Sequence, residues 1–242
     1  MQTLGCVWEH KGDDSLLYSV EFPGAFARGE TLEAALGKME REVRAFLRWR
    51  GTPADGPLSF EIVQESPSRL DIRDADSDVL FAAETGPLSR DTYRERKALA
   101  LKSAADFQAL YDAVPEKDVG CAPARRTFYG PVPRTASEMY AHVRQVNAYY
   151  FGEIGVDADN DGTILDCRLR GFAALEATPG YLENRVYHGS YGEDWTLCKL
   201  LRRFVWHDRI HARALWRMAA RLFGPAVVPD VFCFGDTAQR GG

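Results

Sequence analysis

The alternation of apolar and polar residues predicts strands in the first part of the chain. The stretches "TLGCVWEH" (3–10) and "LLYSVEF" (16–22) partly alternate, as half-buried strands do, and "KGDD" between them is typical of a hairpin turn. Two further short runs, "SFEIVQE" (59–65) and "DVLFAAE" (78–84), have the composition of strands. We expect these four runs to form one small sheet.

Between the second and third runs the period changes to that of a helix. Apolar residues recur every three or four positions from Leu32 to Leu47, and they follow Thr31, a typical N-cap residue. The helix is expected to end near "WRGTPADGP" (49–57). Residues 1–87 therefore predict a small α+β domain with the element order β-β-α-β-β.

From residue 88 onward the helical period dominates. Thr135 and Glu138 have the spacing of a capping box and mark the start of one helix. The fold class predicted for the whole chain is α+β, with an antiparallel four-helix bundle and a C-terminal tail over residues 88–242. The four amphipathic helices are expected at 88–114, 135–154, 163–177 and 194–223.

Composition and charge narrow the classes of partner. The chain has 242 residues and a formal net charge of -5, so it lacks the surplus of Lys and Arg that a general nucleic-acid binder needs. It has no run of about 18 apolar residues and no basic segment leading into an apolar one, so neither a membrane span nor a secretory signal is predicted. Five cysteines without a CxxC pair suggest free thiols in a reducing compartment. We expect a cytoplasmic protein.

Two histidines lie on the apolar stripe of the last predicted helix. In "FVWHDRIHARALW" (204–216), His207 and His211 are one turn apart, and His142 lies on the apolar stripe of the helix at 135–154. Two imidazoles at i and i+4 can bind one divalent cation, and a third from another helix leaves a coordination position open for water or substrate. The three residues are candidate ligands of one divalent transition metal. Zinc or nickel is the first expectation, with iron and manganese as alternatives.

A histidine on an apolar stripe also has a simpler interpretation, a hydrogen-bonded core residue. Three of the five histidines fall on such stripes, which makes coincidence less attractive. His188, in "NRVYHGSYGEDW" (184–195), is a candidate fourth ligand, although exposure to solvent is the simpler interpretation of a loop histidine. A fourth ligand would close the set and favour a structural metal.

Catalytic side chains other than the histidines are weak candidates. Arg203 is one turn before the histidine pair and could hold an anionic substrate, although exposed helix arginines are common. Glu138 is one turn before His142, but its position in the capping box is a sufficient reason for a glutamate there. Tyr150 fits core packing with a satisfied hydroxyl group. Asp208 points about 100° away from its neighbour in sequence and is expected to bind a residue of its own or an adjacent helix.

The loop "DADNDGTILDCR" (157–168) has part of an EF-hand pattern. Asp157, Asp159 and Asp161 occupy positions one, three and five, and Gly162 occupies position six. The twelfth position, which should be a bidentate Glu, is Arg168, and its positive charge would oppose a cation. A polar loop that supplies turns and an N-cap is the favoured interpretation.

Two segments resemble known families. "YSVEFPGAFARGETLEAAL" (18–36) resembles the HicB-like domain, with its strand, Pro-Gly, turn and helix. The runs "TASEMYAHVRQVNAYYFGEIG" (135–155) and "EDWTLCKLLRRFVWHDRIHARALWRMAARLFG" (193–224) resemble the DinB-like family of four-helix bundles. That resemblance implies a divalent metal held by His142 and by the pair His207 and His211.

The DinB-like resemblance also implies a class of reaction. Members of that family include metal-dependent hydrolases and transferases that use small thiols. We therefore expect a small-molecule substrate or a small thiol as partner, with no nucleic acid and no membrane. The alternative is a non-catalytic stress-response or interaction module with structural histidines. Homodimerisation through a sheet edge is a further expectation, and nothing in the pattern fixes the stoichiometry.

Overall fold

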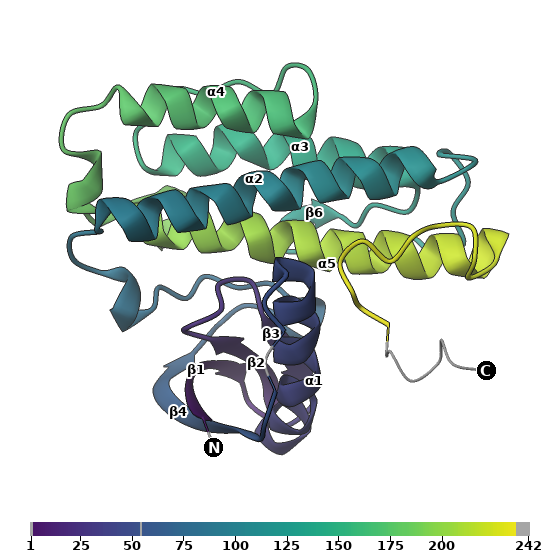
Figure 1. Cartoon of the computed structure of the whole chain (residues 1–242), viewed down its shortest axis with the longest axis horizontal. Coiled ribbons are helices and arrows are strands. Elements are labelled where there is room, and N and C mark those ends of the chain that lie inside the picture. Colours follow the sequence, from purple (N-terminus) through teal and green to yellow (C-terminus); the bar gives the residue numbers. More distant parts are fainter. Residues whose placement is uncertain (1, 54, 236–242) are drawn as a thin grey trace.

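The computed structural model describes residues 2–53 and 55–235 and has a mixed α+β fold (Figure 1). Within these residues there are five α-helices and one four-stranded sheet, together with two short two-stranded ladders. The helices are α1 (Leu32–Arg50), α2 (Arg90–Ala113), α3 (Ala136–Glu153), α4 (Ile164–Glu176) and α5 (Leu197–Phe223). The strands are β1 (Gln2–Lys11), β2 (Asp14–Ser19), β3 (Phe26–Gly29), β4 (Leu58–Pro67), β5 (Arg126–Thr127), β6 (Gly130–Pro131), β7 (Tyr187–His188) and β8 (Asp194–Trp195).

The four-stranded sheet has the strand order β3-β2-β1-β4. β1 and β2 are antiparallel, as are β2 and β3, whereas β4 returns through α1 and pairs parallel with β1. Both faces of the sheet are covered. Leu4 and Cys6 belong to the main hydrophobic cluster, which includes α1, while Val7 and Tyr18 belong to a second cluster with Trp206 of α5. Burial on both faces explains why alternation in these strands is incomplete.

The predicted order β-β-α-β-β is wrong in two places, and the observed order is β-β-β-α-β. The first difference is β3, which lies in the Pro-Gly and Gly-Glu stretch that the sequence predicts as a connection. Gly24 has a φ of +100°, and a Cβ atom there would collide with Val205 of α5. A Cβ atom at Gly29 would collide with the first turn of α1. Gly24 permits close approach of the backbone in the turn before β3, and Gly29 permits it at the end of β3, so a short strand lies between the two glycines.

The second difference is the segment 78–84, which is not a strand. Its apolar side chains alternate because they are buried against the second face of the sheet. Its backbone groups, however, bind side chains and not another strand. The N–H groups donate to the carboxylate of Glu9 and the amide oxygen of Gln64, and the carbonyl groups accept from Gln64 and Lys199. The alternating pattern indicates which side chains are buried. It does not show where the backbone groups find their hydrogen-bond partners, which here lie far away in sequence.

The helices begin and end close to their predicted positions because their caps are local. Thr31, Ser89, Thr135, Thr163 and Thr196 each accept a hydrogen bond from the backbone N–H three residues later. α2 packs on α4 and α5, and α3 packs on the same two helices. These four helices form a layer above the sheet and α1, with α5 between the two parts (Figure 1). No helix of the described residues is long and apolar enough to span a membrane.

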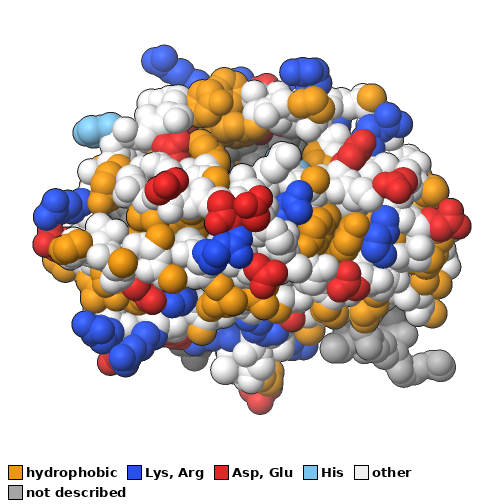
Figure 2. All heavy atoms as spheres, turned by 90° about the horizontal axis from the view of Figure 1, so that it is seen from above, with side chains coloured by type: hydrophobic (Ala, Val, Ile, Leu, Met, Phe, Trp, Pro, Cys, Tyr) orange, Lys and Arg blue, Asp and Glu red, His pale blue; other side chains and the backbone are white. Residues whose placement is uncertain are grey.

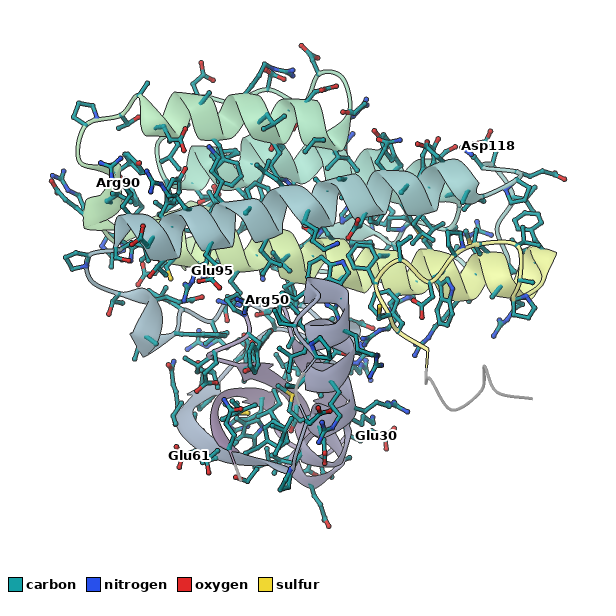
Figure 3. The ribbon with its side chains drawn as sticks, in the orientation of Figure 1. Glu30, Arg50, Glu61, Arg90, Glu95 and Asp118 are labelled. Atoms are coloured by element: carbon teal, nitrogen blue, oxygen red, sulfur yellow. The ribbon has the colours of Figure 1, made fainter. Side chains whose placement is uncertain are left out.

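α5 is buried on all sides along half of its length. Every residue from Leu197 to Arg209 is buried, including five with charged side chains. On the sheet side, Arg202 binds the carboxylate of Glu84 at 2.5 Å, and Arg209 binds Glu42 of α1 at 2.8 Å. Nearer the surface, Arg50 of α1 pairs with Glu95 of α2 (Figure 3). Ion pairs therefore join the two parts of the chain.

On the helical side, Asp208 binds the guanidinium of Arg168 in α4, with one contact of 2.6 Å, and both side chains are completely buried. Ser103 of α2 also donates to this carboxylate, and Arg168 donates to the carbonyl oxygen of Ala100. The expected contact of Asp208 with a neighbouring helix is confirmed. Asp208 thus connects α2, α4 and α5 at one point.

Replacing Asp208 with Ala would leave the Arg168 guanidinium buried without its counter-charge. We expect the free energy of unfolding to fall by about 3–5 kcal/mol, because desolvation of the remaining charge is no longer offset. Urea denaturation measures this loss. The matched control is Glu40→Ala, which breaks an exposed pair with Arg44 on α1 and should cost less than about 0.5 kcal/mol. Similar losses in the two variants would contradict a structural role for the buried pair.

Candidate metal centre

α3 and α5 pack against each other and bring three histidines together. His142 lies in the second turn of α3, and His207 and His211 lie one turn apart on α5. Positions i and i+4 of a helix share a face, so both imidazoles of α5 point toward the same side. One candidate ligand atom from each of the three residues lies within 4.8 Å of the other two.

The distances between the three rings fit a single ion. The ring centroids are 4.4 Å apart for His207 and His211, 4.5 Å for His142 and His211, and 5.0 Å for His142 and His207. The Nε2 atoms of His142 and His207 are 3.1 Å apart. Two nitrogens bound to one tetrahedral zinc lie about 3.3 Å apart, given bonds of 2.0–2.1 Å. The three histidines could therefore bind one metal ion.

The second ring nitrogen of His207, on the side of the ring away from the Nε2 atom that approaches His142, has no hydrogen-bond partner among the described residues. This nitrogen, Nδ1, is buried. Leaving such an atom unsatisfied costs about 1–3 kcal/mol, which makes an unexplained nitrogen a feature of functional sites. Within the described part of the chain, no further His, Cys, Asp or Glu belongs to the three-histidine group. The ligand set is therefore open.

Burial keeps these imidazoles neutral. Desolvation lowers the pKa of His142, and it lowers the pKa of His211 to about 3, with His142 as the second cause. The pKa of His207 lies well below its ordinary value because of desolvation and, next, the two neighbouring histidines. A neutral imidazole carries the lone pair that a metal ion needs.

The histidines line a cavity of about 370 Å³. Gln145 and Tyr149 of α3 and Arg203 and Trp206 of α5 form part of its wall. One face of the molecule is hollowed beside a group of hydrophobic side chains (Figure 2). A cavity of this size, lined by aromatic, apolar and polar side chains together, is typical of a small-molecule site.

The hairpin of β5 and β6 closes one side of the cavity. It is held to the segment after β4 by polar contacts. Arg125 pairs with Asp74 at 2.6 Å, and the backbone N–H of Phe128 donates to the carboxylate of Asp76 at 3.2 Å. Asp74 and Asp76 themselves line the cavity. The wall is therefore built from both parts of the chain.

Two of the weaker sequence candidates lie in the cavity wall. Arg203 is buried and donates to the carbonyl oxygen of Ser77 at 2.9 Å, and its guanidinium carbon is 5.7 Å from the ring centroid of Tyr150. The ring of Tyr150 is 6.0 Å from that of His207. Burial raises the pKa of Tyr150, so its hydroxyl group stays protonated at neutral pH.

The other candidates lie elsewhere. Glu138 accepts a hydrogen bond from the backbone N–H of Arg134 at the start of α3 and is not part of the cavity wall. The side chain of His188 is 89% exposed and pairs with Asp194. His188 is not part of the three-histidine group, and its exposure agrees with the simpler interpretation of a loop histidine that faces solvent.

The acidic loop at 157–168 is neutralised by its own chain. Arg170 binds both carboxylate oxygens of Asp159 and the carbonyl oxygen of Asp161. This contact is the main reason that the pKa of Asp159 falls to about 2. Asp166 forms a capping box with Thr163. The loop acts as a turn and helix cap, as predicted.

Several residues of the cavity wall carry no signal in the sequence. Tyr129 precedes α3, Tyr191 precedes α5, and their rings meet edge to face with a centroid distance of 6.2 Å. Both lie in aromatic-Gly turns, "FYG" (128–130) and "SYG" (190–192), and this shared pattern is the single hint that could have paired them. Trp206 precedes His207 in sequence and also lines the cavity, and the apolar period of the helix does not single it out.

A buried charge cluster lies behind the cavity. Lys199 binds Glu193 at 2.9 Å, and Arg203 approaches the same carboxylate at 3.9 Å. Lys199 also donates to the carbonyl oxygens of Asp78 and Asp194. Desolvation lowers the pKa of Lys199 from 10.5 to about 8, against the opposing effect of Glu193.

The lowered pKa of Lys199 makes stability depend on pH. The unfolded chain binds this proton up to about pH 10.5, whereas the folded chain releases it near pH 8. The cost of burying the charge is therefore complete below pH 8 and disappears as the pH rises toward 10.5. Urea denaturation gives the free energy of unfolding of Lys199→Met minus that of the native chain. This difference should be larger at pH 7 than at pH 10. Lys11→Met, at an exposed pair with Asp71, should show no such trend.

Comparison of the chain with protein-family models, with curated proteins and with solved structures found no match in any of the three.

Proposed function

We propose that this protein is a metal-dependent enzyme that performs hydrolysis or thiol-dependent transfer on a small molecule. The observation that carries the proposal is the open set of three neutral imidazoles in the wall of a cavity of about 370 Å³. A structural metal normally has a closed set of four protein ligands, whereas a catalytic metal keeps a position for water or substrate.

The proposal includes a finer interpretation of the fold. α2 to α5 would be a four-helix bundle of the DinB-like type, and the sheet with α1 would be a HicB-like layer. The packing of α5 on α2 and α3, and the position of the histidines on α3 and α5, support the first part. The turn at Gly24 and the Gly29-Glu30-Thr31 entry into α1 support the second.

The side chains around the histidines suit a reaction without a protein nucleophile. When bound, a divalent ion would polarise a carbonyl or thiol group and activate water. Burial raises the pKa values of Tyr149 and Tyr150, so their hydroxyl groups donate hydrogen bonds to a substrate and do not act as bases. Arg203 contributes a fixed positive charge at the wall. Trp206 and the hairpin form further parts of the wall.

Elemental analysis after purification without chelator, followed by reconstitution with Zn²⁺ or Ni²⁺, tests the metal. We expect about one equivalent per chain, as a single three-histidine site predicts. The double variant His207→Ala/His211→Ala should lose it, because only one of the three imidazoles remains. His188→Ala is the matched control and should retain the metal, since this residue is exposed and lies outside the group.

Ester, amide and thiol-transfer substrates then test the reaction. Activity should require the metal, return when the metal is restored, and be absent from the double variant. Failure of the native chain to bind metal after reconstitution would contradict the proposal and favour the non-catalytic alternative with structural histidines. Activity that persists in the metal-free double variant would also contradict it.

A further inference from the structure

We propose that the cavity beside the histidines binds a small aromatic carboxylate, with the carboxylate at Arg203 and the ring among the tyrosines of the wall. The inference names the substrate class of the proposed enzyme and rests on the proposed function only for the reaction that would follow binding. Binding itself depends on the fixed side chains of the wall and is testable without a metal.

Charge is the first argument. Behind the cavity, Lys199 binds the carboxylate of Glu193 at 2.9 Å, whereas Arg203 approaches the same carboxylate only to 3.9 Å. Glu153, another buried carboxylate near Tyr149, accepts a hydrogen bond from the backbone N–H of Ser190. Neither Glu193 nor Glu153 is part of the cavity wall, whereas Arg203 is. A buried cation that faces a cavity favours an anionic ligand.

The acidic residues of the wall do not reverse this charge. Asp74 pairs with Arg125 at 2.6 Å, and both line the cavity. Asp76 accepts a hydrogen bond from the backbone N–H of Phe128. Both acids contact the hairpin, whereas Arg203, one turn before His207 on α5, reaches the same segment at the carbonyl oxygen of Ser77. Arg203 is therefore the arginine of the wall that forms no hydrogen bond to a carboxylate of the described chain.

Unpartnered hydrogen-bond donors are the second argument. The Nε atom of Arg203, the hydroxyl group of Tyr149 and the indole nitrogen of Trp206 are buried and have no hydrogen-bond partner within the described chain. All three residues line the cavity, and Arg203 and Trp206 are each only 4% exposed. Other buried donors, such as the Nε atoms of Arg168 and Arg209, also have no partner, but these three share one cavity, where the acceptor of a ligand can satisfy them. A carboxylate has four lone-pair sites and suits this set.

Aromatic side chains are the third argument. Tyr129, Tyr149, Tyr150, Tyr191 and Trp206 all line the cavity. Tyr191 meets the rings of Phe128 and Tyr129 edge to face, and its side chain stays largely exposed at the entrance. Aromatic rings pack well against each other in offset or edge-to-face geometry, so these walls favour a flat ring over an aliphatic chain.

The position of Arg203 also orients the ligand. Arg203 lies four positions before His207, which corresponds to a distance of about 6 Å along the axis of α5. A carboxylate at Arg203 would place the far side of a single aromatic ring next to the histidines. The bond that reacts in the proposed enzyme would then be a substituent on that far side.

Isothermal titration of the full chain with benzoate, benzamide and acetate tests the inference. In metal-free protein we expect benzoate to bind about tenfold more tightly than neutral benzamide, because hydrogen bonds to a charged group add roughly 1.5 kcal/mol or more. Acetate should bind more weakly than benzoate because it lacks the ring. In Arg203→Met the preference for benzoate should fall below about twofold, and in Arg203→Lys part of it should return.

The matched control is Arg94→Met, which removes an exposed arginine of α2 and should leave the preference unchanged. Thermal melts test whether each variant is folded. If an Arg203 variant does not fold, Tyr149→Phe takes its place, because it removes one unpartnered donor of the same wall. Equal affinity for benzoate and benzamide in metal-free protein would overturn the inference. A preference that appears only with Zn²⁺ and survives in Arg203→Met would also overturn it, because the metal would then bind the carboxylate.

The two proposals can fail separately. If the native chain binds no metal but still prefers benzoate through Arg203, the proposed function fails and the inference stands. If it binds one metal without any preference for benzoate, the inference fails and the metal-dependent function stands.

Discussion

The burial of charged side chains on α5 is the constraint on which the rest of the structure depends. A helix that buries Lys199, Arg202, Arg203, Asp208 and Arg209 is unstable unless each charge finds a partner. The partners come from α1, α4, the loop before α5, and the segment after β4. The arrangement of the sheet relative to the helices is therefore set by polar contacts as well as by the apolar core.

The same constraint explains which parts of the fold the sequence could predict. Helix positions follow from local signals, such as the N-cap at Thr196 and the apolar period that follows it. The segment 78–84 could not be assigned from such signals, because its carbonyl groups bind Lys199 and Arg202, more than a hundred residues away. Its strand-like pattern comes from burial of its side chains against the sheet, whereas its irregular backbone comes from hydrogen bonds to side chains.

The candidate site divides in a similar way. His207 and His211 could be found because helical spacing places them on one face, and His142 because it interrupts another apolar stripe. Tyr129, Tyr191 and Asp76 could not, since they lie in loops and reach the cavity only through tertiary contacts. Arg203 was a weak candidate because helical arginines are common on surfaces. Its burial, with the contact to Ser77, makes it part of the wall.

The order of the elements along the chain has a consequence for biosynthesis. α5 supplies two of the three histidines, and during translation it leaves the ribosome after every strand and helix that packs on it. Until then, Glu42 and Glu84 lack the arginines that neutralise them in the finished protein. A nascent chain that ends before α5 lacks two of the three histidines, so the three-histidine group can assemble only after α5 has been synthesised.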